Sequence, residues 1–580
     1  MSTKNKNVNN LTGIAASPGF AQGEALVYKP TNLDFEPHRV PEVDQEIDRL
    51  NRAAKATFDE LEILKQKVKS QLGEESAHIF RSQQTIVEDD SLLDEIRESI
   101  REKSCLAESG VLEVFGTYRA LFEEIEEGNY NRERIADLED VQNRLVRVLL
   151  GRPQQSLAFL ERPVVVIAEE LFPSDTAAMD KRMVQGLVTE KGGITSHVAI
   201  IARNLGVPAA VGVRGATITL ESGDEITLDC TEPSQAQIYG NPSPDTAAPL
   251  KIRRQAYQQR QEFLENQKGQ EPITLDGHRI KLSANIGSVE DIPKALADGA
   301  QSVGLFRTEF LFMAQKTLPG EEAQFQAYKK AVESFPEGFV ILRTLDIGAD
   351  KKVDALPLAH EENPFLGYRG VRISLGRTDL FTTQLRAAIR ASAYGNLKIM
   401  FPMICGPDEV RTIYEHLDRI KKDLKNEKQK FDEHLQIGVM LEVPSAIFMA
   451  PEILALVDFV SIGTNDLTQY LLAADRMNEQ IQDYYQPFHP GVFRAIHQVV
   501  QVAHQVGKWV GICGELGGMP RALPALIGLG VDELSMNSQS LAESVYKIRS
   551  LTFHQAKALA DRVLKLGDSK EIQSILEKGD

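Results

Sequence analysis

From about residue 270 onward, the chain alternates short apolar runs with segments of helical character. Eight of these runs have the length and composition of buried strands, and they lie at 280–285, 302–306, 340–345, 398–402, 437–442, 459–463, 509–513 and 533–536. Strands that alternate with helices at this spacing form a parallel sheet, and eight of them favour closure into a barrel. We therefore predict a (β/α)8 barrel over residues 271–580.

Polar side chains stand where these predicted strands end. The set comprises Arg307, Arg343, Glu442, Asn465, Asp466 and Cys513. The C-terminal strand ends of an eight-stranded barrel meet at one mouth, so residues far apart in sequence share a site there. The pattern therefore predicts one site at the mouth. The alternative interpretation is a ring of salt bridges that stabilises the barrel rim.

These residue types suit a small anionic substrate. Arg307 and Arg343 can hold a phosphate and a carboxylate through bidentate hydrogen bonds. Glu442 and Asp466 offer the hard oxygen ligands that Mg²⁺ prefers. Cys513 is ambiguous by itself: a buried cysteine usually serves as a small hydrophobic residue, whereas a thiol at a barrel mouth can donate a proton.

The first half of the chain has a different pattern. A strand-like stretch at 13–28 precedes amphipathic segments, which predict helices at 43–68, 91–100, 111–125 and 135–148. Short apolar strands follow at 163–168, 186–189, 210–211, 225–228 and 238–239, and a charged, glutamine-rich helix is predicted at 251–267. We assign 1–38 and 152–245 to an α/β domain, 39–151 to an inserted helical domain, 246–270 to a helical linker and 271–580 to the barrel.

A second candidate site lies in the segment GGITSH, which ends at His197. Its two glycines permit a tight turn with exposed backbone amides, and Thr195 or Ser196 can cap the helix that follows. His197 then stands in the first helical turn, where the helix dipole favours an anion and disfavours the imidazolium. A neutral imidazole in this place suits a nucleophile that accepts a phosphoryl group. Taken alone, such a histidine would be interpreted as a structural cap.

Composition excludes several classes of function. The 65 basic and 83 acidic residues give a net charge of −18, whereas nucleic-acid binding needs a net basic surface. No stretch approaches the ~18 apolar residues of a membrane span, and MSTKNKNVNN lacks the apolar core of a signal peptide. The four cysteines lack CxxC spacing, which indicates neither a zinc site nor a disulfide framework and favours a reducing compartment. We expect a cytoplasmic protein with no membrane insertion and no nucleic-acid partner.

Long strings of a known family occur along the chain in order. They are GIAASPG (13–19), GGITSH (192–197), GLFRTEFLFM (304–313), RTLDIGADK (343–351), ENPFLGYRGVRI (362–373), IMFPMI (399–404), SIGTNDLTQY (461–470), the pair Asp475-Arg476 and GICGELGG (511–518). In these strings the chain resembles Enzyme I of the bacterial phosphotransferase system, the phosphoenolpyruvate–protein phosphotransferase family. The resemblance covers nearly the whole chain.

The resemblance implies a substrate and the residues that bind it. By this resemblance, Arg307, Arg343 and Arg476 bind phosphoenolpyruvate. Asn465 and Asp466 touch the phosphate of the substrate. The family's fold agrees with the domain prediction: a swivelling phosphohistidine α/β domain, an inserted helical domain that docks the carrier protein HPr, and a C-terminal (β/α)8 TIM barrel that forms a homodimer.

The resemblance also implies the chemistry of the remaining residues. By this resemblance, His197 is the histidine that is phosphorylated, and Cys513 protonates the enolpyruvate carbon as pyruvate forms. Glu442 and Asp466 hold the Mg²⁺ cofactor. The reaction that follows is autophosphorylation from phosphoenolpyruvate, followed by transfer of the phosphoryl group to HPr as the first step of sugar phosphotransfer.

The chain departs from the family pattern near the histidine. Ile194 stands where an arginine is common, and Val198 and Ala199 replace the more usual small hydroxyl residues. These departures, with a less well matched helical domain, bear on which carrier is recognised. Arg369 and Arg372 fall in another family string, which implies a supporting role in the site.

Two other functions are weighed against this one. An ATP-dependent dikinase or phosphoenolpyruvate synthase would carry a large nucleotide-binding domain before the histidine domain. Here about 160 residues precede the strand at 163, most of them helical, and no glycine-rich nucleotide loop is visible. A regulatory scaffold that binds phosphoenolpyruvate without turnover is the second alternative, and the intact set of reactive residues argues against it.

Overall fold

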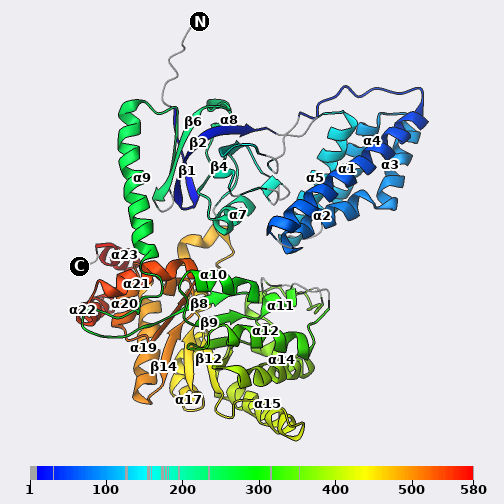
Figure 1. The fold of residues 1–580 in the computed structure, drawn as a ribbon. Coiled ribbons are helices and arrows are strands. Elements are labelled where there is room, and N and C mark those ends of the chain that lie inside the picture. Colours follow the sequence, from blue (N-terminus) through cyan, green and yellow to red (C-terminus); the bar gives the residue numbers. More distant parts are fainter. Residues whose placement is uncertain are drawn as a thin grey trace. The chain divides into compact units, whose positions relative to one another are not determined.

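The computed structural model of the chain forms two compact units, Met1–Arg260 and Gln261–Asp580. It describes residues 9–29, 32–72, 74–124, 129–152, 157, 160–171, 175–176, 179–180, 182–193, 196–232, 235–313, 317–349, 351, 353 and 355–578. Figure 1 shows the fold of each unit, coloured along the sequence.

The described part of the second unit contains a closed barrel of eight parallel strands (Figure 1). The strands are β8 (Lys281–Ile286), β9 (Val303–Arg307), β10 (Val340–Arg343), β11 (Leu397–Phe401), β12 (Gln436–Leu441), β13 (Phe459–Ile462), β14 (Trp509–Ile512) and β15 (Glu533–Met536). β15 pairs with β8 in parallel, which closes the barrel. The predicted (β/α)8 architecture is confirmed, and no predicted strand end lies more than two residues from the observed one.

Helices follow the strands and pack on their outer faces. They are α10 (Ile292–Ala297), α11 (Glu309–Met313), α12 (Glu321–Glu333), α13 (Val371–Gly376), α14 (Thr378–Ala391), α15 (Pro407–Asn426), α16 (Pro444–Phe448), α17 (Ala450–Leu454), α18 (Thr464–Leu472), α19 (Pro490–Gln505), α20 (Leu523–Gly528), α21 (Leu541–Arg549), α22 (Phe553–Val563) and α23 (Ser569–Lys578). Short 3-10 helices lie at Val289–Asp291, Pro364–Leu366, Ser392–Tyr394, Glu479–Tyr484, Glu515–Gly518 and Ser538–Ser540. In α15, Val410, Ile413, Leu417, Ile420 and Leu424 recur at spacings of three and four and are all buried, which explains how such a segment covers a sheet.

The inner faces of the barrel strands form a separate, smaller core. On β10, Val340 and Leu342 belong to the outer core, whereas Ile341 between them belongs to the inner cluster. Successive side chains of a strand point to opposite faces, so Ile341 points into the barrel. The rings of Phe459 and Trp509, from neighbouring strands, stack with centroids 4.5 Å apart in this cluster. The barrel interior is therefore filled by side chains.

Among the described residues of the first unit, seven strands close a second sheet in the order β1-β5-β4-β3-β2-β6-β7. They are β1 (Asn9–Ser17), β2 (Gly19–Tyr28), β3 (Val164–Ala168), β4 (Val184–Thr189), β5 (Ala209–Val211), β6 (Glu225–Glu232) and β7 (Gln235–Gly240), with α7 (His197–Leu205) and α8 (Ala216–Thr219) between them in sequence. β2 and β3 pair in parallel although a long helical segment separates them in sequence. The prediction of an α/β domain interrupted by helices agrees with this sheet.

The inserted segment forms helices with a core of their own. They are α1 (Val43–Leu72), α2 (Glu74–Val87), α3 (Asp90–Lys103), α4 (Ala107–Glu124) and α5 (Asn129–Leu149). α2 is missing from the sequence prediction. Its buried face includes Gln83 and Gln84 beside Phe80 and Val87, so the apolar stripe is interrupted by polar residues. The Gln83 side chain donates to Asp140 at 2.8 Å, which makes its burial possible.

A single long helix, α9 (Pro244–Glu265), covers most of the predicted helical linker. It crosses the division between the two units at Arg260. The finer division of the chain into four parts stays a prediction. None of the described helices combines the length and the apolar character of a membrane span.

Candidate active site

The polar residues predicted from the strand ends lie at the C-terminal mouth of the barrel. Arg307 and Arg343 are the last residues of β9 and β10, and Glu442 directly follows β12. Asn465 and Asp466 lie in the first turn of α18, which begins after β13. The strands of the closed barrel are parallel and end on the same side, so these side chains belong to one mouth.

Arg343 is almost fully buried and is held by two carboxylates. Its Nη2 donates to Glu309 Oε1 at 2.5 Å, and its Nη1 lies 3.0 Å from Asp346 Oδ2. Lys351 Nζ donates to the same Glu309 oxygen at 2.7 Å. Burial disfavours the charged guanidinium, but Glu309 and Asp346 outweigh burial and hold the pKa of Arg343 above its ordinary value. Arg343 is therefore a fixed positive charge at the base of the mouth.

Arg369 joins two acidic residues that come from different parts of the chain. Its Nη2 donates to Asp346 Oδ1 at 3.2 Å, and its Nη1 donates to Asp466 Oδ1 at 3.2 Å and to the Tyr470 hydroxyl at 3.0 Å. The side chain is 2% exposed. Burial works against its charge, but Asp346 and Asp466 outweigh burial, so the pKa of Arg369 lies above its ordinary value. Arg369 thus orients Asp466 at the mouth.

At Glu442, unlike at the two arginines, burial is the dominant influence on the charge of the side chain. Glu442 is fully buried, and its Oε1 accepts a hydrogen bond from the Met403 amide at 2.7 Å. Burial, together with the negative charges of Asp466 and Asp346, raises the pKa of Glu442 to about 8. The positive charges of Arg369 and Arg343 offset only part of this rise in pKa. A cation bound beside Glu442 would offset this burial and the like charges of Asp466 and Asp346.

The carboxylates of Glu442 and Asp466 fit Mg²⁺. This ion is usually bound by one or two carboxylates and completes its coordination with water and substrate oxygens. Among the residues that the structure describes, no three histidine, cysteine, aspartate or glutamate side chains are grouped as a metal site. Two carboxylates suit an ion that shares its coordination with a substrate.

Two further arginines of the mouth are only partly buried. The Arg307 guanidinium lies 5.4 Å from the centre of the Phe310 ring, and burial lowers the pKa of Arg307, which still leaves an arginine charged. Its Nε is buried and has no hydrogen-bond partner in the described part of the chain. Arg476 Nη1 lies 4.0 Å from Asp466 Oδ1, so Arg476 belongs to the same charged cluster as Asp466.

Asn465 and Cys513 complete the predicted set. Asn465 Oδ1 accepts from the Glu515 amide at 3.0 Å, which orients the amide side chain. Cys513 directly follows β14, and its Sγ donates to the Ile462 carbonyl at 3.9 Å. Burial raises the pKa of the Cys513 thiol to about 12, so the thiol carries its proton at neutral pH. It is therefore in the protonation state that a proton donor requires.

The predicted nucleophile segment begins a helix of the first unit. Ser196 is the N-cap of α7, and its Oγ accepts from the Ala199 amide at 3.4 Å. Gly192 has φ of 100°, a conformation that favours glycine, so this position in the turn before the helix requires it. The α7 backbone starts at His197, as the sequence predicts. The His197 side chain, and both Ile194 and Thr195, lie outside the described residues.

Three family models match the chain in order. "PEP-utilising enzyme, N-terminal" matches residues 12–134, "PEP-utilising enzyme, mobile domain" matches 160–232, and "PEP-utilising enzyme, PEP-binding domain" matches 261–553. The phosphoenolpyruvate-protein phosphotransferase of Geobacillus stearothermophilus is 41% identical over 98% of this chain and 97% of its own length. The proteins of the same name from Haemophilus influenzae and Staphylococcus carnosus are 40% and 38% identical, each over 98% of both chains. The chain belongs to the phosphoenolpyruvate-protein phosphotransferase family.

The family relationship agrees with the position of the two sites. The model of the PEP-binding domain covers the barrel strands β8 to β15, and the model of the mobile domain covers α7. All eight residues predicted for the site lie within these two matched segments. The resemblance found in the sequence is therefore confirmed.

Glu309 and Lys351 are missing from the site predicted for this phosphotransferase. Both lie in strings that carry the family resemblance, GLFRTEFLFM and RTLDIGADK. Glu309 is fully buried at the start of α11. Its local sequence does not indicate this burial, because the partner that makes burial possible, Arg343, lies on β10. Its position two residues after the strand-end Arg307 is the signal that points to the mouth.

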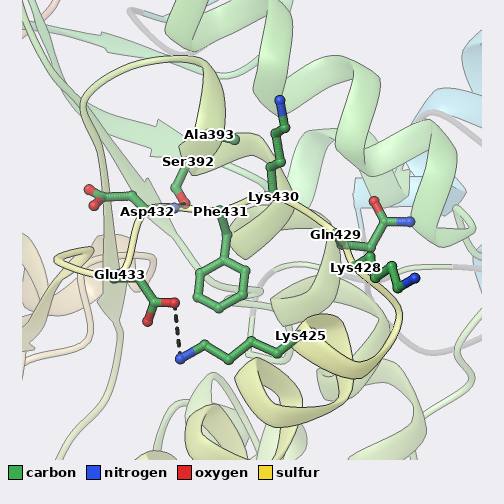
Figure 2. A pocket seen from close by; sticks show the side chains of 9 residues that line it. All are labelled: Ser392, Ala393, Lys425, Lys428, Gln429, Lys430, Phe431, Asp432 and Glu433. Atoms are coloured by element: carbon green, nitrogen blue, oxygen red, sulfur yellow. Dashed lines mark hydrogen bonds and ion pairs between the residues drawn. The ribbon is translucent and has the colours of Figure 1, made fainter.

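A cavity of about 550 Å³ opens at the opposite end of the barrel (Figure 2). Its lining residues precede β11 and β12, and they include Lys425, Lys428, Lys430 and Phe431. In Figure 2 the three lysine side chains point in different directions, and Lys425 is paired with Glu433 at 2.9 Å. The lysine side chains therefore do not converge on one point of this cavity.

Proposed function

We propose that the chain transfers the phosphoryl group of phosphoenolpyruvate to His197, releases pyruvate, and passes the phosphoryl group to the carrier protein HPr, the first step of sugar phosphotransfer. One observation carries this proposal. Buried arginines and carboxylates, Arg343, Arg369, Glu442 and Asp466, converge at the barrel mouth of a chain that belongs to the phosphoenolpyruvate-protein phosphotransferase family. This cluster combines cations for an anionic substrate with oxygen ligands for a divalent metal.

The arginines of the mouth bind the substrate in this proposal. Phosphoenolpyruvate carries a phosphate and a carboxylate, which are the two groups that arginine binds with paired hydrogen bonds. Arg307, Arg343 and Arg476 provide the positive charges, and the Asn465 amide donates to the phosphate. Arg343 is fixed by Glu309 and Asp346 before substrate arrives, so little reorganisation is needed when charge shifts during the reaction.

Two carboxylates of the mouth bind the metal in this proposal. Glu442 and Asp466 hold Mg²⁺, and Arg369 orients Asp466 for this purpose. When bound, the ion neutralises charge on the transferring phosphoryl group. The raised pKa of Glu442, which results from burial and from the charge of Asp466, is consistent with this role, because a bound cation would stabilise its carboxylate.

His197 is the nucleophile of the proposed reaction. The first turn of α7 disfavours a proton on the imidazole and stabilises an added anionic group, because backbone amides at a helix N-terminus carry partial positive charge. The imidazole attacks phosphorus in line, the N–P bond forms, and the P–O bond to enolpyruvate breaks. Because His197 and the barrel residues lie in different units, the proposal requires the units to meet during the reaction.

Cys513 completes the chemistry by protonating the leaving group. Enolpyruvate takes the thiol proton on its methylene carbon, which gives pyruvate and leaves a thiolate. Burial raises the pKa of this thiol to about 12, so the thiol keeps its proton at neutral pH until the methylene carbon of enolpyruvate accepts it.

The partners and location are part of the same proposal. The helices α1 to α5 dock HPr, and the barrel forms the homodimer contact, as the family resemblance implies. We also propose a cytoplasmic location, where the four free cysteines stay reduced.

Transfer of label from phosphoenolpyruvate tests the proposal. The purified chain is incubated with Mg²⁺ and ³²P-labelled phosphoenolpyruvate, beside His197→Ala and the matched variant His504→Ala, whose histidine forms a surface pair with Asp532. We expect acid-labile label on the wild type and on His504→Ala, and none on His197→Ala. Label on His197→Ala would overturn the assignment of the nucleophile. An unlabelled wild type that still binds phosphoenolpyruvate would favour a scaffold, and a requirement for ATP would favour a dikinase.

A further inference from the structure

The barrel interior contains a carboxyl group that the proposed mechanism does not use. Glu533, the first residue of β15, is fully buried. Neither of its carboxyl oxygens has a hydrogen-bond partner within the described residues. Buried polar groups are almost always hydrogen-bonded, so a carboxyl group in this state requires an explanation.

The environment of Glu533 keeps it protonated. Burial raises the pKa of Glu533 to about 8, and the nearby Ser283 hydroxyl and the Lys281 ammonium offset only part of this effect. At neutral pH Glu533 therefore carries a proton that it can donate, inside a barrel whose mouth holds the reacting groups.

Two glycines give the carboxyl group its space. A methyl group placed on Gly511 would lie 2.6 Å from Glu533 Oε2 and 3.3 Å from Ser461 Oγ, and one placed on Gly304 would overlap Glu533 Oε1. Gly511 is in register with Ser461 on one side and with Glu533 on the other. The missing side chain therefore leaves the Glu533 carboxyl and the Ser461 hydroxyl facing the same small space.

Ser461 connects this space to Cys513. Its Oγ is buried and, like the Glu533 oxygens, lacks a hydrogen-bond partner of normal length in the described part of the chain. Ser461 directly precedes Ile462, whose carbonyl accepts from the Cys513 amide at 3.1 Å and from the Cys513 thiol at 3.9 Å. The Ser461 hydroxyl also offsets part of the rise that burial causes in the pKa of that thiol. Ser461 therefore stands between an internal acid and the thiol at the mouth.

On the neighbouring strand β8, Glu533 lies beside a residue that is exposed to solvent. Lys281 is in register with Glu533 on β8 and is exposed at the N-terminal end of the barrel. Its Nζ lies 5.5 Å from the centre of the Trp509 ring and 5.9 Å from that of Phe339, so the side chain lines the base of the interior. Polar groups thus form one row from the base of the barrel to its mouth. The row consists of Lys281, Glu533, Ser461 and Cys513.

We propose that Glu533 returns to Cys513, through Ser461 and one bridging water, the proton that Cys513 gives to the enolpyruvate carbon. This inference rests on the proposed function. The S–H bond of Cys513 breaks as pyruvate forms, the Glu533 O–H bond then breaks as the S–H bond re-forms, and the Glu533 carboxylate takes a proton from solvent past Lys281. The transfer is downhill, because a thiolate whose acid has a pKa of about 12 accepts the proton from a carboxyl group with a pKa of about 8.

Isotope exchange between phosphoenolpyruvate and pyruvate separates this step from the rest of the reaction. The full chain is incubated in D2O with Mg²⁺, phosphoenolpyruvate and ¹⁴C-labelled pyruvate. Movement of ¹⁴C into phosphoenolpyruvate needs no proton from solvent, because the Cys513 thiolate takes a proton from the methyl group of the incoming labelled pyruvate. After the first turnover, deuterium enters the pyruvate methyl group only when Cys513 exchanges that proton with solvent before it protonates the next enolpyruvate.

We expect the wild type to incorporate deuterium as fast as it exchanges carbon. Glu533→Gln, which keeps the size of the side chain, should leave carbon exchange within about twofold and slow deuterium entry by about tenfold or more. Glu533→Asp should restore part of the deuterium entry, because it keeps the carboxyl group. Ser461→Ala should act like Glu533→Gln, whereas Ser544→Ala, which removes an equally buried hydroxyl outside the row, should leave both rates unchanged.

The other outcomes would overturn the inference in distinguishable ways. Deuterium entry that keeps pace with carbon exchange in Glu533→Gln would show that Cys513 exchanges its proton at the mouth. An equal loss of both rates in Glu533→Gln and in Ser461→Ala would assign these residues a structural role only. A wild type that exchanges no carbon would overturn the proposed function itself, and this inference with it.

Discussion

Glu309 and Glu533 are both fully buried in the same barrel, and their neighbours give them opposite charge states. Burial alone would raise the pKa of Glu309, but Arg343 Nη2 at 2.5 Å and Lys351 Nζ at 2.7 Å outweigh burial and hold that pKa below its ordinary value. Among the residues that the structure describes, Glu533 has no such cation at hydrogen-bond distance, and burial raises its pKa to about 8. At neutral pH, Glu309 is an anion that holds Arg343 in place, and Glu533 is a neutral acid.

The raised pKa of Glu533 makes the stability of the barrel depend on pH. The folded barrel binds this proton up to about pH 8, whereas the unfolded chain releases it near an ordinary glutamate pKa. The stabilising contribution is therefore full below the unfolded pKa and is lost as pH rises through the folded pKa, by up to about 1.4 kcal/mol per pH unit. Glu533→Gln lacks this dependence, so between about pH 5.5 and 8 the wild type should lose stability relative to the variant.

Denaturant unfolding of both proteins at the two pH values, followed through the barrel transition, measures this difference. Glu309→Gln is the matched control at a carboxylate whose pKa is lowered. It breaks a buried ion pair and should destabilise the barrel by about 3–5 kcal/mol at both pH values alike. A wild type and a Glu533→Gln variant whose midpoints keep a constant difference across the range would show that Glu533 is not protonated in the folded barrel.

At the scale of elements, apolar runs predicted the eight barrel strands because both faces of each strand are buried. Such runs need no alternation with polar residues, and polar residues at the ends of several strands, such as Arg307, Arg343 and Glu442, mark the side of the barrel where the mouth lies. Helix α2 shows the limit of this reasoning. Gln84 on its buried face accepts from Lys65 at 2.8 Å and donates to Glu62 at 2.8 Å, and no local pattern predicts partners on another helix.

The same limit applies to the site. The strand-end rule placed Arg307, Arg343, Glu442, Asp466 and Cys513 at one mouth, because position along a strand is a local property. The rule could not show that Glu309 holds Arg343, or that Arg369 bridges Asp346 and Asp466. These pairings depend on how side chains from separate strands and loops meet in three dimensions.

Helix α7 carries a prediction of its own, because its cap precedes the proposed nucleophile. Ser196 accepts from the Ala199 amide, and loss of such a cap typically costs about 1 kcal/mol of helix stability. Ser196→Ala should therefore speed amide hydrogen exchange in the first turns of α7 roughly fivefold. Ser196→Asp is the matched control, since aspartate caps as well as serine and should keep exchange near the wild-type rate. Unchanged exchange in Ser196→Ala would mean that the cap contributes nothing to this helix.

At the scale of the whole molecule, the proposed chemistry is divided between two units. His197 lies in the first unit, and every proposed substrate and metal ligand lies in the second. The model of the PEP-binding domain begins at residue 261, which is also where the second compact unit begins. The barrel therefore has its own core, its own sheet and its own set of ligands, so it should respond to substrate independently of the first unit.

Calorimetry of the intact chain can test this independence. A chain of two compact units does not unfold in a single two-state step, so we expect at least two thermal transitions. Phosphoenolpyruvate with Mg²⁺ should stabilise only the barrel, by about 2.7 kcal/mol at a hundredfold excess of ligand over the dissociation constant, and so raise only the barrel's transition temperature.

The measurement is made in His197→Ala, because this variant lacks the phosphoryl acceptor and so keeps the ligand intact during the scan. Adding Arg343→Ala should abolish the shift, and the first transition should stay in place throughout. A single transition that ligand raises as a whole would instead show that the two units unfold as one cooperative body.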